Sequence, residues 1–356
     1  MVLAAPAAMA QAARPDDTAR YLAGLELAPG SPLASLAGEA SWQNHAQILD
    51  RNWGEAERRQ LAKASAWSAR VVPQASPLML YLFSGPDFLY ADTFFPNAST
   101  YVLSGLEPVG TPPDVTRLTP GERAKALAAL RVPLGHILQF SYFITKDMAH
   151  QLRASKLTGT LPLIYVFLAR TGKRIEAVSL VSLMRNGAVE PRRDKAPKGA
   201  SPGVKITFSD DRGQKRTLYY FRTDLSNAGL KSSGFMVFCR TLGPADSLLK
   251  AASYLLHTGG FTTVRALLLE RSATVVQDDS GIPLRYFTPG EWQLFPYGAY
   301  YGPIPVFKRW YQPGMDRLFA RGRAARVDFG IGYRWPPRDT NILLAVKRTE
   351  LPWRQP

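Results

Sequence analysis

The chain has 356 residues, of which 46% are hydrophobic and 20% are charged, so it can bury a sizeable core and does not have the composition of a disordered protein. Its 44 basic and 28 acidic side chains give a formal net charge of +16, which favours an anionic partner or surface. The longest uninterrupted apolar run, 161–169, is less than half the length of about twenty residues that a membrane-spanning helix needs. We therefore predict no transmembrane segment.

The first residues carry a processing signal. Two overlapping A-x-A patterns, at 8–10 and 10–12, are followed at once by the polar residues Arg14, Asp16 and Asp17. Small residues at these spacings are typical of signal-peptidase cleavage, so we predict that residues 1–12 are a signal-peptide remnant and that the protein is periplasmic or secreted. An alanine-rich tail on a cytosolic protein is the alternative. Export would argue against nucleic acid as the partner of the basic charge.

The segment 13–76 is predicted to be helical. Between 41 and 70, apolar residues including Trp42, Leu49, Trp53 and Trp67 recur at helical spacing and form one stripe. A helix of this kind packs its stripe against a larger body.

A change of pattern at residue 77 indicates the start of an α/β domain. A strand at 78–83, a short helix at 88–94 and a strand at 100–103 resemble the opening of a parallel sheet. Thr119 and Glu122 form a capping box for a helix that reaches about residue 131.

The rest of the chain continues the alternation of strands and helices. We predict helices at 146–157, 246–257 and 262–271, strands at 161–169, 175–183, 235–240, 274–277 and 341–346, and a β-hairpin insertion formed by 204–208 and 216–221. The single cysteine, Cys239, falls in one of these strands and cannot form an intramolecular disulfide. The predicted fold is a single α/β domain over 77–356, with a mixed, largely parallel sheet flanked by helices.

Several blocks of this domain resemble those of an uncharacterised family of exported bacterial proteins. The blocks are 84–88, 94–97, 106–110, 145–148 and 277–283, so the resemblance covers most of residues 77–346. It implies export and an unknown function, and it carries over no catalytic residues.

Acidic, turn-rich segments follow four of the predicted strands. Because ligands bind beyond the carboxyl ends of the strands in open α/β sheets, we expect these segments to meet at one edge. In a cluster of carboxyl groups, one can be protonated and act as an acid while another is ionised and acts as a base, or the group can bind Ca²⁺ or Mg²⁺. Alternatively, each Asp accepts hydrogen bonds from the backbone of its own turn. The candidates are Asp87 and Asp279 as catalytic groups, with Ser84, Glu107, Asp224, Asn227 and Asp278 as ligand-binding residues.

Two further candidates are not acidic. His257 lies at the end of a predicted helix, where the helix dipole favours a charged imidazole, and is a candidate for proton transfer or simply a cap. Tyr297 and Tyr300 lie in an aromatic segment rich in Gly and Pro that can form the apolar wall of a ligand pocket or cover an edge of the core.

No motif names a reaction. We find no P-loop, no nucleophile elbow, no zinc-binding motif and no dinucleotide fingerprint, so no cofactor is indicated, although the acidic loops leave a divalent cation open. The favoured hypothesis is an exported hydrolase-type enzyme with a carboxylate-lined pocket at the strand ends. The alternative is a non-catalytic periplasmic binding protein for an anionic envelope polymer or a small ligand.

Overall fold

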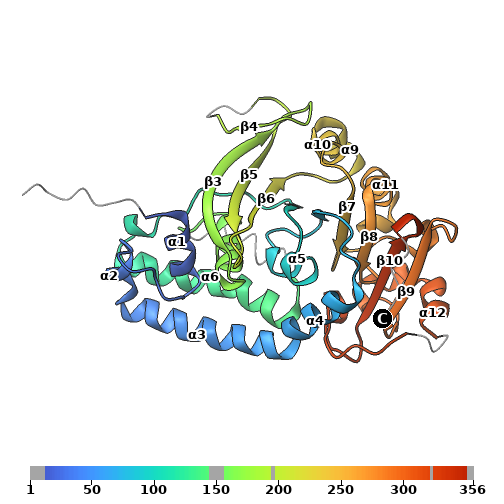
Figure 1. Cartoon of the computed structure of the whole chain (residues 1–356), viewed down its shortest axis with the longest axis horizontal. Helices are drawn as coiled ribbons and strands as arrows, with labels where there is room; N and C mark the ends of the chain where they lie inside the picture. The colour runs from blue at the N-terminus through green and yellow to red at the C-terminus, as the bar shows by residue number, and fades with distance from the viewer. Residues whose placement is uncertain (1–12, 144–155, 194–196, 321–323, 351–356) are drawn as a thin grey trace, which may run out of the picture.

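A ten-stranded sheet lies between two layers of helices in the computed structural model, which describes residues 13–143, 156–193, 197–320 and 324–350 (Figure 1). The strand order is β4-β3-β5-β6-β2-β1-β7-β8-β10-β9. None of the described helices is both long and apolar enough to cross a membrane.

The parallel strands occupy the middle of the sheet. They are β6 (Lys215–Arg222), β2 (Thr100–Gly105), β1 (Leu78–Tyr81), β7 (Ala245–Leu249) and β8 (Ser272–Gln277). Antiparallel strands extend the sheet on both sides: β4 (Val189–Pro191), β3 (Arg174–Leu183) and β5 (Ser201–Ser209) on one, β10 (Asn341–Lys347) and β9 (Trp292–Gly298) on the other.

The predicted mixed α/β sheet is therefore confirmed, as is the hairpin, which is β5–β6 and forms part of the sheet. The expectation of a largely parallel sheet applies only to its centre, because five of the nine neighbouring pairs among the described strands are antiparallel. β4 and β9 were not predicted, and they lengthen the two antiparallel ends.

Each face of the sheet has its own apolar layer. Side chains alternate between the faces, so that Met79 and Tyr81 join one layer while Leu78 and Leu80 join the other. The first layer is covered by α1 (Pro15–Leu22), α3 (Ala40–Ala56), α4 (Ala62–Val71), α5 (Phe88–Phe94), α6 (Pro120–Phe140) and α8 (Leu161–Arg170). The second is covered by α9 (Asn227–Ser232), α10 (Phe235–Thr241), α11 (Thr262–Arg271) and α12 (Pro313–Ala320).

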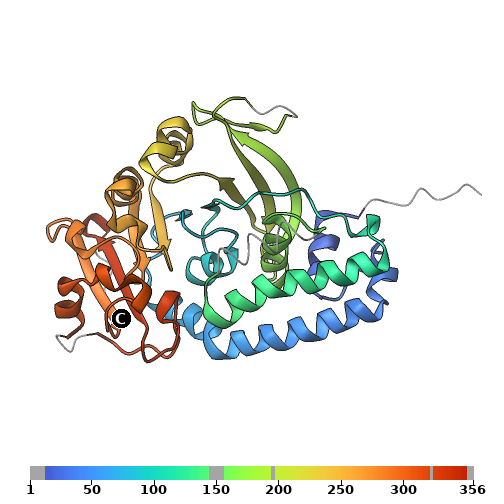
Figure 2. The same ribbon diagram turned by 180° about the vertical axis from the view of Figure 1, so that it is seen from behind.

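The predicted N-terminal helix is present and runs beside α6, as both views show (Figures 1 and 2). It is interrupted by a π-helical turn, Glu57–Leu61, between α3 and α4. Such turns insert one extra residue and often occur near functional sites. This turn points the buried amide of Gln60 at the hydroxyl of Tyr90 on α5, to which it donates a hydrogen bond.

Three predicted elements are wrong. The run 161–169 forms the helix α8 and not a strand, because it is buried on all sides and Pro162 suits the first turn of a helix. The segment 235–240, which contains Cys239, belongs to the helix α10. The predicted helix 246–257 begins instead as the fully buried central strand β7. Most of the predicted helix 146–157 lies outside the described residues.

The buried His45 on α3 generates a test of this packing. Its Nε2 lies 2.8 Å from the carbonyl oxygen of Leu22 and its Nδ1 lies 3.3 Å from the guanidinium of Arg131, so the neutral ring donates to one partner and accepts from the other. Burial lowers the pKa of His45 to about 4, whereas in the unfolded chain it is about 6.5.

Below pH 6.5, His45 therefore becomes protonated in the unfolded state but stays neutral in the folded state. The free energy of unfolding falls as the pH is lowered towards 4. We expect the loss of unfolding free energy between pH 7 and pH 4.5 to be about 2 kcal/mol smaller in His45→Gln than in the wild type, measured by urea denaturation. Equal losses in the two proteins would show that His45 is not buried in its neutral form.

Candidate functional site

A small cavity lies where the parallel strands β1, β2 and β7 end. Its volume is about 70 Å³, enough for a few water molecules or one group of a ligand. It is lined by Tyr81, Phe83, Ser84, Gly85, Asp87, Glu107, Tyr142, Phe143, Lys250 and Ala251. Phe83, Tyr142 and Phe143 are only half-buried, so the cavity has an aromatic rim at the surface.

A buried ion pair forms one wall of this cavity. Lys250 follows β7 and Asp87 follows β1, and their Nζ and Oδ2 atoms lie 3.0 Å apart with both side chains no more than 2% exposed. Asp87 also caps α5 by accepting the amide hydrogen of Tyr90 at 3.0 Å and accepts the hydroxyl hydrogen of Tyr81 at 2.9 Å. The carboxylate is thus saturated by three donors from different elements.

The ammonium of Lys250 has further partners. Its Nζ donates to the carbonyl oxygen of Ser141, just past the end of α6, and lies 4.0 Å from the ring centre of Tyr90. Burial lowers the pKa of Lys250, and the attraction of Asp87 opposes this effect. The site therefore holds a buried lysine whose charge is stabilised mainly by the Asp87 carboxylate.

Glu107 contributes a second carboxyl group, which, unlike that of Asp87, has no cation beside it in the described residues. It is 7% exposed, and its Oε2 atom has no hydrogen-bond partner among the described residues. Burial raises its pKa, and hydrogen bonds from the neighbouring backbone and Tyr220 oppose this effect. The carboxyl group packs against Gly105 so closely that a Cβ there would overlap Oε2, which explains glycine at the end of β2.

Asp278 and Asp279, at the end of β8, support the site rather than line the cavity. Asp278 accepts the amide hydrogen of Ala251 at 2.9 Å, and Asp279 accepts the hydroxyl hydrogen of Tyr254 at 2.6 Å. Burial and the neighbouring Asp279 raise the pKa of Asp278 to about 6. The two carboxyl groups therefore act on the segment that carries Lys250.

That segment is strained. Ala251, Ser253 and Tyr254 have φ values of 51°, 52° and 54°, which side-chain-bearing residues rarely adopt. Such a conformation costs of order 1 kcal/mol or more per residue and persists only where neighbours enforce it. Asp278 and Asp279 provide this restraint, and they thereby fix where the backbone turns after Lys250.

The structure brings Ser84, Asp87 and Glu107 to one cavity, and it places the other sequence-predicted residues elsewhere. Asp224 is exposed and accepts the amide hydrogen of Ser226 in its own turn, and Asn227 binds Gly259 and Thr262. For Asp224 the turn-binding alternative holds, whereas Asn227 joins α9 to the start of α11.

His257 and the two tyrosines are packing residues. His257 lies in a short 3₁₀ turn, 5.1 Å from the ring of Tyr254, and burial lowers its pKa to about 4, so the expected charged imidazole at a helix end is wrong. Tyr297 belongs to β9 and packs on Trp67, while Tyr300 is 6% exposed and its hydroxyl accepts the amide hydrogen of Gln312.

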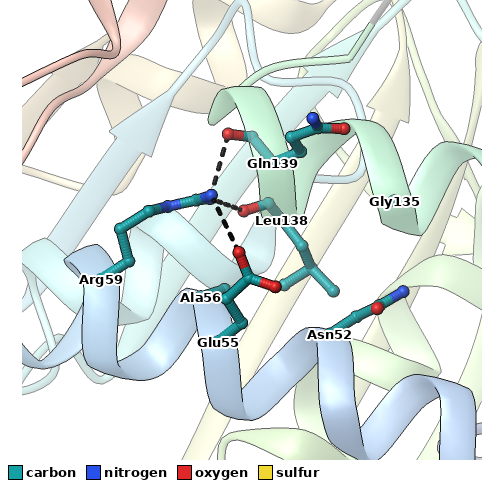
Figure 3. A pocket seen from close by; sticks show the side chains of 7 residues that line it. All are labelled: Asn52, Glu55, Ala56, Arg59, Gly135, Leu138 and Gln139. Atoms are coloured by element: carbon teal, nitrogen blue, oxygen red, sulfur yellow. Dashed lines mark hydrogen bonds and ion pairs between the residues drawn. The ribbon is translucent and has the colours of Figure 1, made fainter.

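A larger hollow of about 250 Å³ lies between α3 and α6 (Figure 3). Arg59 crosses it to donate to the carbonyl oxygens of Leu138 at 2.7 Å and Gln139 at 3.1 Å, and it lies 3.7 Å from Glu55 (Figure 3). These partners satisfy the charge of Arg59 and tie the π-helical turn to the end of α6. The hydrogen bonds of Arg59 thus hold the end of α6 in place, next to Ser141, whose carbonyl oxygen accepts a hydrogen bond from Lys250.

Lys250 is not among the site residues predicted from the sequence. The residue was assigned to a helix because Asp246, behind a Gly-Pro pair, suggests a helix start. The segment itself gives no clear strand signal, because Asp246 and Ser247 interrupt its apolar residues, Ala245, Leu248 and Leu249. In the part of the chain that the structure describes, no group of three or more His, Cys, Asp or Glu side chains is arranged to hold a metal ion.

The ion pair predicts an asymmetric response to mutation. Lys250→Met leaves the Asp87 carboxylate buried without its cation, so we expect the free energy of unfolding to fall by about 3–5 kcal/mol. Adding Asp87→Asn removes the stranded charge, and the double variant should be more stable than Lys250→Met alone, as measured by chemical denaturation. If Asp87→Asn lowers the free energy of unfolding of Lys250→Met by as much as it lowers that of the wild type, the two side chains are not coupled.

No family model, curated protein or solved structure matches this chain. The chemistry of the site must therefore be argued from its own residues.

Proposed function

We propose that the protein is a hydrolase-type enzyme whose active site is the cavity of Glu107, Asp87 and Lys250. The observation that carries the proposal is that Glu107, whose buried Oε2 has no hydrogen-bond partner among the described residues, shares the lining of one cavity with a buried lysine–carboxylate pair. A buried polar atom without a partner is costly unless a ligand or water binds it.

The two acidic groups have the division of roles that hydrolysis needs. Glu107, whose pKa is raised by burial, supplies a proton to the leaving group. The Lys250–Asp87 pair receives the proton of the attacking water: Lys250 passes its own proton to Asp87 and takes up one from the water. Ser84, also in the cavity lining, donates its hydroxyl hydrogen to the carbonyl oxygen of Gly85 at 2.9 Å and keeps its oxygen as an acceptor for orienting the substrate.

We further propose that this enzyme acts in the periplasm or is secreted. The support is the pair of A-x-A patterns in residues 1–12, which lie outside the described residues. The second candidate, a non-catalytic binding protein for an anionic polymer or small ligand, is favoured by the segment 301–311, on which Tyr301, Lys308 and Arg309 are exposed.

The test is a hydrolysis screen with 4-nitrophenyl glycosides, esters and phosphates and with soluble polysaccharides, analysed by mass spectrometry. We expect the wild type to cleave at least one class, and Glu107→Gln to lower kcat at least about 100-fold because the amide cannot supply the proton. Gln has the shape of the protonated carboxyl group, so the melting temperature of this variant should change little.

Asp224→Asn is the matched control, because Asp224 is an exposed carboxylate at the end of another parallel strand and lies outside the cavity. It should retain full activity. Undiminished turnover in Glu107→Gln would overturn the assignment, and a wild type that binds a polymer without cleaving it would support the binding protein instead.

A further inference from the structure

A row of aromatic side chains leads away from the cavity along the same edge of the sheet. Tyr142 at the cavity rim lies 5.1 Å from Tyr333, and Tyr333 lies 5.3 Å from Phe307, measured between ring centres. Phe307 and Trp310 are joined by the buried rings of Tyr254 and His257, with successive distances of 4.9, 5.1 and 5.5 Å. The four outer rings are half-buried, so their edges or faces reach the surface.

This row ends at an exposed apolar ridge formed by residues 301–311. Of the six large hydrophobic side chains that are exposed in the described part of the chain, three lie here: Tyr301 (66%), Val306 (79%) and Tyr311 (49%). Exposed apolar groups gathered on one segment mark an interaction site more often than scattered ones do.

The ridge is also positively charged. Lys308 and Arg309 are exposed on it, Arg309 lies 4.9 Å from the ring centre of Trp310, and the nearby Arg285 is exposed as well. None of these three cations has a carboxylate within ion-pair distance among the residues that the structure describes. Their charge is therefore free to attract a polyanion.

We propose that the 301–311 ridge and the aromatic row bind a strand of anionic polysaccharide and lead one of its units to the cavity of Glu107. The last part rests on the proposed function. Aromatic rings can stack on the apolar faces of sugar rings, and the free cations can attract acidic groups on the sugars. The carboxyl oxygens of the cavity can accept hydrogen bonds from the hydroxyl groups of a sugar unit.

The probe is polygalacturonate, a polymer of uronic acids, with binding to the full chain measured by isothermal titration calorimetry. We expect binding that weakens steeply with salt and exceeds that of a neutral glucan. The double variant Lys308→Ala/Arg309→Ala should weaken it roughly tenfold. Tyr301→Ala should weaken it independently of salt, because it removes stacking and no charge.

The matched control is Arg51→Ala/Arg58→Ala, which removes the same charge from the exposed surface of α3 and of the π-helical turn that follows it, and should leave the affinity unchanged within about twofold. Equal affinities of the ridge variant and this control would overturn the proposal. So would tighter binding to single-stranded DNA or to anionic phosphatidylglycerol vesicles that the ridge variants abolish, which would assign the ridge to nucleic acid or to a membrane surface.

The outcome is separate from that of the hydrolysis screen. Glu107→Gln should bind polygalacturonate as the wild type does, since the ridge does not include the cavity acid. Ridge-dependent binding without any hydrolysis would remove the catalytic proposal alone, and hydrolysis without ridge-dependent binding would remove this one alone.

Discussion

The ion pair between Lys250 and Asp87 is the interaction on which the site depends. A lysine and an aspartate at 3.0 Å, both almost fully buried, are stable only when their remaining bonding capacity is satisfied. Here Tyr81, the amide of Tyr90 and the carbonyl of Ser141 meet that requirement. These partners come from β1, α5 and the end of α6, so the pair joins the sheet to the helices that cover one of its faces.

The surrounding structure can be understood as support for this pair. The π-helical turn directs Gln60 to Tyr90, and Arg59 holds the last carbonyls of α6. On the other side, Asp278 and Asp279 hold the strained segment after Lys250 through Ala251 and Tyr254. Backbone strain and buried charge both cost stability, and proteins retain such features mainly at functional sites. This pattern is our reason for placing the function at the cavity and not in the larger hollow between α3 and α6.

The sequence predicted the elements whose pattern is local. The strands β1, β2, β8 and β10 appear as short apolar runs next to turn residues, and the capping box of Thr119 and Glu122 marks the start of α6. Elements buried on all sides were assigned wrongly, because α8 and β7 show no alternation that distinguishes a helix from a strand. The error at β7 concealed Lys250, since its importance follows only from its position after a central parallel strand.

The candidate site was predicted in part for the same reason. Asp87 and Glu107 follow β1 and β2, which are neighbours, so the strand-end argument brings them together. Asp224 follows β6, a parallel strand one position further out, yet its turn folds away from the cavity. Sequence position fixes the edge of the sheet on which a residue lies, whereas the tertiary packing of each loop decides whether the side chain reaches the cavity.

The central claim is that the cavity combines a buried Glu107, whose pKa is raised by burial, with the Lys250–Asp87 ion pair. The most direct test is the infrared difference spectrum between the wild type and Glu107→Gln, recorded from pH 4 to pH 8. We predict the carbonyl band of a protonated carboxylic acid that persists above pH 4.5 and disappears in the variant. A Glu107 carboxyl group that is ionised throughout this range would contradict the account, because a solvated carboxylate could not serve as the acid of the site.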